Sequence, residues 1–282
     1  MDVFKFAAFA DESNEKFIGQ IDALKRNNYS FLEIRAVDGK NFTELSLDEA
    51  REKAKLLKDN GLSVWSLGSP IGKVDINCDF TEYLELYKKT LELGKIFETE
   101  HIRLFSFFMP KDENPDNYKN LVIDRMGKFA ELAREYRIIP CHENEKGIYG
   151  DTAGRCFGIH SALPEIKAVF DPANFVQCGE DTIKAWSKME PYVEYMHIKD
   201  AVGGKVVPPG TGDGNVAELL RLYKKAGGSV LTLEPHLYDF VGLKSLEQEG
   251  EESAVGAMNF NSSEEAFDYA AERLNELIGK LI

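Results

Sequence analysis

This 282-residue chain is poor in cysteine and histidine and contains no long apolar run. Its four cysteines (Cys78, Cys141, Cys156 and Cys178) form no C-x-x-C pair, so we expect free thiols in a reducing cytoplasm rather than a disulfide framework. No segment approaches the roughly 20 apolar residues of a membrane span. The N-terminus lacks the basic stretch and apolar core of a signal peptide. These absences predict a cytoplasmic protein without a membrane partner.

Basic residues are also in short supply. The chain has 34 lysines and arginines against 48 aspartates and glutamates, which gives a formal net charge of −14. Because neutralisation of phosphates dominates affinity for nucleic acids, an acidic body disfavours a nucleic-acid partner. We interpret the excess of negative charge as a determinant of solubility.

The chain alternates between apolar, strand-like runs and amphipathic, helix-like runs. The expected strands are Phe4–Ala10, Ser30–Arg35, Ser63–Leu67, His101–Phe107, Ile138–Glu143, Ile166–Asp171, Val193–Lys199 and Ser229–Glu234. The expected helices are Glu15–Asn28, Leu47–Asn60, Phe80–Phe97, Tyr118–Tyr136, Asp151–Leu163, Asp181–Met189, Asn215–Ala226 and Ser263–Ile278. Strict alternation indicates a parallel sheet, and eight units in a chain of this length favour an α/β fold of the (β/α)8 TIM-barrel type. We expect one domain over residues 1–282, with no composition shift to mark a boundary.

Two helix ends and one connection have clear local signals. Gly61 lies where a helix C-terminal glycine belongs, and Asn215 is a candidate N-cap. The connection at about 237–262 is long and acidic, and loops of this length are often lids or disordered segments. A lid, a subunit contact in a homo-oligomer and a solvated excursion are all compatible with it.

Four strand-like segments in the second half of the chain each end on a side chain that binds metals well. They are Glu143, Asp171, His197 and Glu234, separated by 28, 26 and 37 residues. One strand–loop–helix–loop unit takes roughly 25–45 residues, so this spacing predicts one such side chain for each βα unit. In a parallel barrel all four would lie at the carboxyl end, where such folds bind ligands.

Alternation along the strands lets this prediction be checked. If Glu143 faces the barrel interior, His142 points outward, toward the helices. The same parity puts His236 on the face of Glu234. Three carboxylates and one imidazole suit one hard divalent ion, for which we expect manganese, with Mg²⁺, Co²⁺ and Zn²⁺ as alternatives.

A divalent ion in such a site acts as a Lewis acid toward a carbonyl and its neighbouring hydroxyl. The C–H bond between them becomes acidic, and a glutamate can remove the proton to leave a metal-bound enediolate. Returning the proton to the neighbouring carbon isomerises a sugar, and returning it to the opposite face epimerises it. Epimerisation needs two bases, for which Glu143 and Glu234 lie on suitably separated strands.

Five motifs together give the chain a recognisable pattern. They are His142-Glu143-Asn144, Phe170-Asp171-Pro172-Ala173-Asn174, His197-Ile198-Lys199-Asp200, Gly210-Thr211-Gly212-Asp213-Gly214 and Leu233-Glu234-Pro235-His236. The chain resembles the xylose isomerase-like TIM-barrel family of sugar isomerases and epimerases. The resemblance implies that Glu143, Asp171, His197 and Glu234 hold the metal and that Glu143 and Glu234 are the catalytic acid/base pair.

Further residues are candidates for holding a carbohydrate substrate. The resemblance implies that Lys199 lies near the substrate. It also marks Asn174 as a departure, because several epimerases have histidine at that place. Glu33, Arg35, Lys73, Arg103 and His236 are strand-end or loop residues. Arg35, Lys73 and Lys199 could bind an anionic group, or could instead form stabilising ion pairs within the barrel.

Three other functions remain in view. One is a lyase that dehydrates an inosose-like cyclic polyol ketone, and another is a non-catalytic sugar-binding barrel. The third resembles the DNA-repair endonucleases that share this barrel and hold several zinc ions with more histidines. With five histidines and a net charge of −14 the chain fits that class poorly.

Overall fold

A computed structural model describes residues 4–240 and 258–281 of the chain. Eight parallel strands form a closed barrel in the order β1-β12-β9-β8-β7-β6-β5-β2. The barrel strands are β1 (Lys5–Ala8), β2 (Phe31–Ile34), β5 (Ser63–Leu67), β6 (His101–Leu104), β7 (Ile139–Glu143), β8 (Lys167–Phe170), β9 (Val193–Ile198) and β12 (Val230–Leu233). The first strand pairs with the last, with Ala8 opposite Leu233. The predicted (β/α)8 TIM barrel in a single domain is confirmed.

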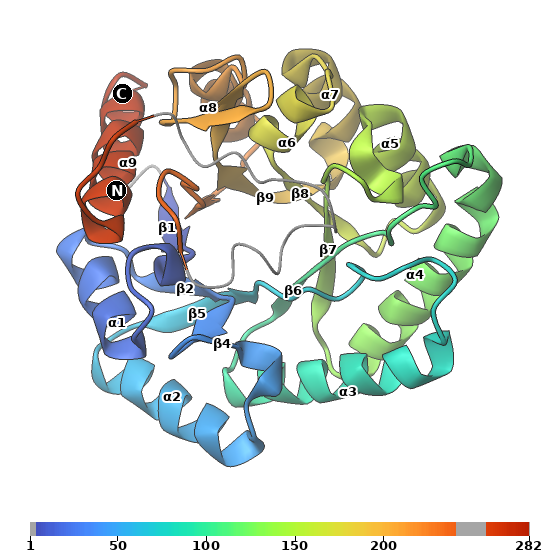
Figure 1. The fold of residues 1–282 in the computed structure, drawn as a ribbon, viewed down its shortest axis with the longest axis horizontal. Helices are drawn as coiled ribbons and strands as arrows, with labels where there is room; N and C mark the ends of the chain where they lie inside the picture. The colour runs from blue at the N-terminus through green and yellow to red at the C-terminus, as the bar shows by residue number, and fades with distance from the viewer. Residues whose placement is uncertain (1–3, 241–257, 282) are drawn as a thin grey trace.

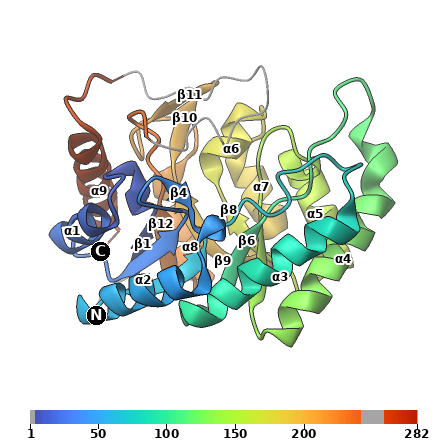
Figure 2. The same cartoon turned by 60° about the horizontal axis from the view of Figure 1, so that its bottom comes forward.

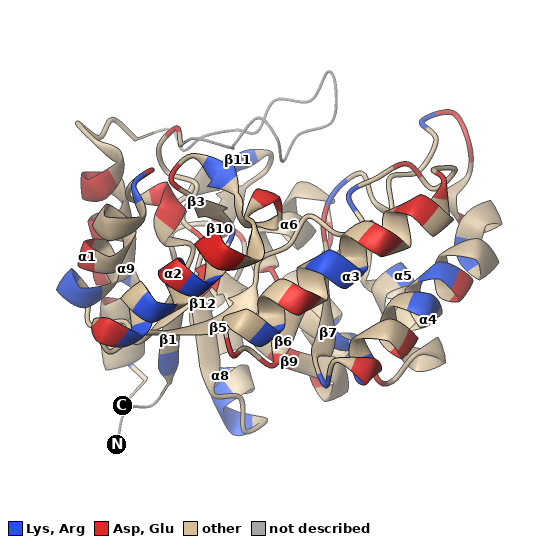
Figure 3. Ribbon diagram, turned by 90° about the horizontal axis from the view of Figure 1, so that it is seen from below, with Lys and Arg blue, Asp and Glu red and all other residues tan. Residues whose placement is uncertain are grey.

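The helices form an outer ring around the strands (Figure 1). They are α1 (Phe17–Arg26), α2 (Leu47–Asp59), α3 (Phe80–Ile96), α4 (Lys119–Glu135), α5 (Ala153–Ala162), α7 (Thr182–Met189), α8 (Val216–Lys225) and α9 (Ser263–Gly279). Acidic and basic residues are interspersed along several of them (Figure 3). In the part of the chain that the structure describes, no helix has the length and hydropathy to cross a membrane.

Three small elements were not predicted. A short helix, α6 (Pro172–Gln177), begins directly after β8, because Asp171 accepts a hydrogen bond from the Asn174 backbone N–H and caps it. Two hairpins, β3–β4 (Ala36–Val37 with Lys40–Asn41) and β10–β11 (Asp200–Val202 with Lys205–Val207), follow β2 and β9. Figure 2 shows β10, β11 and α6 at one end of the barrel, far from the N-terminus. These insertions build up the carboxyl end.

Two predicted strands end at least two residues earlier in the structure. The first stops at Ala8, and a 3-10 turn at Ala10–Glu12 follows, so Asp11 and Glu12 bend over the barrel instead of continuing the strand. The fourth stops at Leu104 rather than Phe107, because the backbone of Phe105 and Phe107 bonds to the loop residues Ile71 and Gly72. These departures turn side chains at the strand ends toward the barrel mouth.

Of the two predicted helix ends, the one at Gly61 agrees with the structure and the N-cap at Asn215 does not. Gly61 has φ +72°, as a C-terminal glycine should. Asn215 directly precedes α8 but its side chain makes no capping bond, and its backbone is left-handed at φ 55°. Its amide instead donates to Thr182 Oγ1 at 3.0 Å. The connection at 237–262 lies largely outside the described residues.

Asp200 organises the loop above β9. Its carboxylate accepts backbone N–H bonds from Ala201, Gly210, Gly212 and Gly214, each at 2.9 Å. A Cβ atom at Gly212 would lie 2.5 Å from both the Ala201 carbonyl oxygen and an Asp200 oxygen, so this position needs glycine. The glycine-rich turn therefore wraps one buried carboxylate and fixes the chain that follows Lys199.

His142 points away from the barrel interior, as strand parity predicted. Its Nε2 lies 3.0 Å from Ser106 Oγ, and its ring lies 5.5 Å from that of His160 on α5. Both rings are buried, and burial lowers both pKa values, that of His160 to about 4. His160 Nδ1 lies 2.9 Å from the Ile166 carbonyl oxygen, to which it donates as a neutral imidazole.

Replacing His160 with asparagine should make the free energy of unfolding fall less as the pH is lowered. The unfolded histidine takes up a proton below about pH 6.5 while the folded one stays neutral to about pH 4, so stability falls as pH drops through that window. At about 1.4 kcal/mol per pH unit the effect reaches roughly 3 kcal/mol. Asparagine can still donate to Ile166.

Urea unfolding with chelator at pH 7.5 and pH 4.5 measures this effect. The free energy of unfolding of His160→Asn should fall by about 2–3 kcal/mol less than that of the unmodified chain between the two conditions. An equal fall in both proteins would contradict the prediction.

Candidate functional site

The four predicted ligands meet at the carboxyl end of the barrel. Glu143 is the last residue of β7, Asp171 follows β8, His197 lies in β9 and Glu234 follows β12. Each offers one donor atom, and these atoms lie within 4.8 Å of one another. All four side chains are buried, with at most 3% of each residue exposed. Their assignment as metal ligands stays a prediction, but the geometry it requires is present.

Two asparagines hold the acidic ligands of β7 and β8. The Asn144 side chain donates to the Asp171 carbonyl oxygen at 2.8 Å and accepts from its N–H at 2.9 Å, so it ties the two strand ends together. Asn174, the position that the family resemblance marks as a departure, donates to Glu143 Oε1 at 3.3 Å and to the Asn144 carbonyl oxygen at 3.0 Å. Asn174 is therefore turned toward a predicted ligand.

The His197 ring is held between carboxylates on both sides. Its Nδ1 lies 3.0 Å from Glu143 Oε1 and 3.3 Å from Glu234 Oε2, while its Nε2 lies 3.2 Å from Glu33 Oε2. Burial alone would lower the pKa of His197, but the charges of the three glutamates outweigh it and hold that pKa well above its usual range.

Glu234 has the densest cationic surroundings of the four. Arg35 Nη1 lies 3.0 Å from its Oε1, Lys199 Nζ 3.1 Å from its Oε2, and Arg103 Nη1 3.8 Å from its Oε1. Burial favours the neutral acid, but Lys199 above all and the other positive charges hold the pKa of Glu234 well below its usual range. Glu234 is thus kept ionised.

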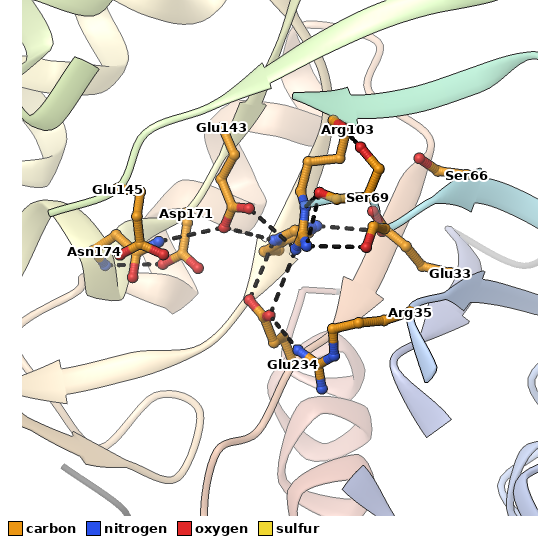
Figure 4. A network of polar contacts seen from close by, with 12 residues as sticks. Glu33, Arg35, Ser66, Ser69, Arg103, Glu143, Glu145, Asp171, Asn174 and Glu234 are labelled. Atoms are coloured by element: carbon orange, nitrogen blue, oxygen red, sulfur yellow. Dashed lines mark hydrogen bonds and ion pairs between the residues drawn. The ribbon is translucent and has the colours of Figure 1, made fainter. Parts of the chain in front are cut away.

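Arg35 is saturated by carboxylates. It makes two hydrogen bonds to Asp11, at 2.8 and 3.2 Å, and one each to Glu12 and Glu234, both at 3.0 Å. Its guanidinium carbon lies 4.4 Å from the Phe9 ring centroid and 4.6 Å from that of Phe240. Figure 4 shows Arg35 beside Glu234 at the edge of the network.

The other cations predicted to hold a substrate are also paired. Arg103 lies 3.3 Å from Glu143 Oε2 and donates to the Gly68 carbonyl oxygen at 3.1 Å. Lys199 lies 2.9 Å from Asp171 Oδ2, and Lys73 lies 3.1 Å from Glu145 Oε2. Sequence analysis left two roles open for Arg35, Lys73 and Lys199: binding an anionic group, or forming ion pairs within the barrel. The structure shows the ion pairs. The direct substrate contacts predicted for Arg35, Lys73, Arg103 and Lys199 stay predictions.

His236 lies beside Glu234, as parity predicted. Its backbone has φ +46°, a strained value for histidine, and its N–H donates to Glu12 Oε2 at 2.6 Å. Its Nε2 lies 3.3 Å from Glu12 Oε1 and 3.5 Å from Glu234 Oε1. Glu12, Glu234 and His236 also have donor atoms close enough for an ion. Arg35 already places a cation between the two glutamates, so this group needs no second metal.

Four further residues make contacts within this site and were not predicted as site residues: Asp11, Glu12, Asn144 and Glu145. Asp11 and Glu12 directly follow the first strand, and that position was an available signal. Burial raises the pKa of Glu12 to about 8, against the opposing charge of Arg35. Asn144 and Glu145 follow Glu143 in the loop after β7. Their partners are distant in the chain, so no local pattern identified them.

The residues present fit a divalent ion. Within the described residues, Glu143 Oε2 and Asp171 Oδ2 are buried and accept no hydrogen bond of good geometry, although Arg103 and Lys199 contact them as ion pairs. A buried acceptor without a hydrogen bond is costly, and coordination would satisfy it. Three carboxylates and one imidazole are the donors that Mn²⁺, Mg²⁺, Co²⁺ and, with less preference, Zn²⁺ accept.

The chain is similar to a protein family and to several solved structures. A family profile described as "xylose isomerase-like TIM barrel" matches residues 21–260. No protein of curated function matches the sequence. A solved IolI protein with a bound zinc atom is 15% identical, with a TM-score of 0.75 over 99% of both chains.

Two further solved structures are similar. The D-psicose 3-epimerase of Clostridium cellulolyticum H10, solved with D-tagatose, is 14% identical, with a TM-score of 0.71 over 98% of this chain and 99% of its own. The probable 3-DHS dehydratase AsbF of Bacillus anthracis is 15% identical, with a TM-score of 0.71 over 97% and 98%. At these identities the likeness shows the fold.

Divalent ions should stabilise the protein through the four predicted ligands. Mn²⁺ at about 100 times its dissociation constant should add about 2.7 kcal/mol to the free energy of unfolding, or roughly 5–10 °C in Tm. Asp171→Asn should lose most of this gain, because it removes one ligand charge while an asparagine oxygen can still cap α6.

Thermal unfolding with Mn²⁺ and with chelator measures the shift. The control is Glu131→Gln, a change at an exposed position on α4, which should respond like the unmodified chain. An unchanged Mn²⁺ response in Asp171→Asn would exclude Asp171 as a ligand.

Proposed function

Because the chain belongs to the xylose isomerase-like TIM-barrel family, we propose that it is a divalent-metal-dependent isomerase or epimerase of a sugar or sugar derivative. The observation that carries the proposal is the convergence of Glu143 and Glu234 on one buried centre from β7 and β12, with His197 Nδ1 within 3.3 Å of both. The D-psicose 3-epimerase neighbour supports it. We expect manganese as the ion.

The bound ion would supply Lewis-acid polarisation of a carbonyl and its neighbouring hydroxyl. Glu234, held ionised by Arg35 and Lys199, removes the proton from the carbon between those oxygens. Glu143 lies across the centre and delivers a proton to the enediolate, at the neighbouring carbon or at the opposite face. Burial of both glutamates keeps bulk water from competing for the proton.

An uncharged substrate fits the electrostatics of the site better than a phosphorylated one. The described residues around the centre carry seven carboxyl groups and four lysine or arginine side chains: Asp11, Glu12, Glu33, Glu143, Glu145, Asp171 and Glu234 against Arg35, Lys73, Arg103 and Lys199. Each of these cations already contacts a carboxylate. A phosphate would have to displace one of those partners, whereas hydroxyl groups can hydrogen-bond without doing so.

The metal-loaded protein should exchange a carbon-bound hydrogen of its substrate with solvent. Incubation with ketoses and cyclic polyol ketones in D₂O, followed by NMR, measures the uptake of deuterium. Glu143→Gln and Glu234→Gln should each slow the exchange by at least about 100-fold, the usual size of a general acid or base effect. Glu194→Gln, at the opposite end of the barrel beside His101, should not.

Other results would point elsewhere. Loss of water from the substrate, seen by mass spectrometry, would favour the dehydratase alternative. The structural similarity to the probable dehydratase AsbF is the reason to test for it. Sugar binding that survives in Glu143→Gln, with no turnover in either protein, would favour a sugar-binding barrel.

The preference for an uncharged substrate can be tested by competition. With a ketose and its phosphate ester at equal concentration, kcat/KM for the free sugar should be at least about tenfold higher, since unfavourable charge contacts cost several kcal/mol. A higher kcat/KM for the phosphate ester would reverse this assignment and leave the isomerase proposal standing.

A further inference from the structure

Glu33 contacts the predicted ligand His197 at Nε2, the ring nitrogen that does not face Glu143 and Glu234. It projects from β2 into the barrel and is fully buried. Its Oε1 accepts a hydrogen bond from the Tyr195 hydroxyl at 2.7 Å, and its Oε2 lies 3.2 Å from His197 Nε2. Both carboxylate oxygens are therefore engaged. Figure 4 shows Glu33 on the opposite side of the network from Asp171.

Tyr195, which donates to Glu33, makes a further contact on the side away from the centre. Its hydroxyl also lies 3.1 Å from Ser66 Oγ. A tyrosine hydroxyl has one proton, and the shorter bond to the carboxylate takes it, so the Ser66 hydroxyl donates to the Tyr195 oxygen. All three side chains are buried, with 0% exposed. The contacts run in one direction, from Ser66 through Tyr195 to Glu33.

The contact between Glu33 and His197 determines which nitrogen of the imidazole ring faces the centre. An imidazole has two nitrogens, and a carboxylate at one of them requires a proton there. Glu33 Oε2 holds a proton on Nε2, and Nδ1 faces Glu143 and Glu234 at the centre, where a bound divalent ion would take the place of the Nδ1 proton. The Phe9 ring meets the His197 ring edge-on at 5.2 Å between centroids and restricts its rotation.

We propose that Glu33, held by Tyr195 and Ser66, is a positioning residue that aims His197 Nδ1 at the divalent ion. The inference rests on the proposed metal centre and replaces the substrate contact expected for Glu33 from the sequence. Outer partners of this kind typically change metal affinity 10- to 100-fold when removed. A substrate contact would instead change KM and leave metal affinity alone.

Metal affinity without substrate provides the test. Mn²⁺ binding is measured by electron paramagnetic resonance of the free ion, and the Co²⁺ visible spectrum reports the ligand field. Glu33→Leu should weaken Mn²⁺ binding 10- to 100-fold and shift the Co²⁺ bands. Glu33→Gln should recover part of the loss, because its amide oxygen can still accept from Nε2. Tyr195→Phe should have a smaller effect than Glu33→Leu.

Val169→Ala serves as the matched control. Val169 packs against Tyr195 in the barrel interior, so its truncation perturbs the same core without touching Glu33. It should lower Tm and leave Mn²⁺ affinity and the Co²⁺ spectrum unchanged. If Glu33→Leu does not fold, the Mn²⁺ affinity and the Co²⁺ spectrum of Glu33→Gln and Tyr195→Phe test the proposal instead.

Two results would overturn the inference in distinguishable ways. Unchanged Mn²⁺ affinity in the Glu33 variants, with a raised KM, would assign Glu33 to the substrate and leave the proposed function intact. Absence of divalent-ion binding by the unmodified protein would overturn both proposals together.

Discussion

Repulsion between buried carboxylates is the constraint that shapes the carboxyl end of this barrel. Two like charges 4 Å apart repel by about 4 kcal/mol at the effective dielectric of a protein, and a whole domain is stable by only 5–15 kcal/mol. Glu143, Asp171 and Glu234 have oxygens within 4.8 Å of one another. Such a group stays ionised only with cations between its members. Arg35, Arg103 and Lys199 supply them, which explains why three long basic side chains are buried here at 4% exposure or less.

The same ion pairs join the two ends of the barrel sheet. Closure places β1 between β12 and β2. Arg35 comes directly after β2 and binds Asp11, which follows β1, and Glu234, which follows β12. One guanidinium thereby links three neighbouring strands across the closure. The Phe9 ring centroid lies 4.4 Å from the guanidinium carbon of Arg35 and 5.0 Å from that of Arg103. The electron-rich ring of Phe9 therefore attracts both cations.

Much of this architecture was predictable from the sequence because it is periodic. Apolar runs of strand length and helices with one apolar face recur in order, so the barrel and the positions of Glu143, Asp171, His197 and Glu234 follow from local pattern and spacing. Strand parity also indicated correctly that His142 points outward. The short helix α6 was missed because Asp171 has two roles, as a strand-end acid and as the cap of a helix.

The partners of the cations could not be predicted in the same way. Arg35 and Glu234 are 199 residues apart, and Tyr195 and Glu33 are 162 apart. Which strand-end side chains meet depends on the bend of the chain after each strand, such as the 3-10 turn that carries Asp11 and Glu12 inward. A strand-end arginine looks the same in the sequence whether it binds a substrate or a neighbouring carboxylate.

The surroundings of Glu143 and Glu234 are unequal, and this bears on the chemistry. Both contact His197 Nδ1, Glu143 at 3.0 Å and Glu234 at 3.3 Å. Glu234 also contacts Arg35 and Lys199 at 3.0 and 3.1 Å, whereas Glu143 has only Arg103, at 3.3 Å, and the neutral amide of Asn174 among the described residues. A histidine at position 174 could carry a further positive charge to Glu143, and asparagine cannot. An epimerase needs one carboxylate ionised while the other carries a proton. The cations around Glu234 keep it ionised, as a base must be, and Asn174 adds no further positive charge beside Glu143.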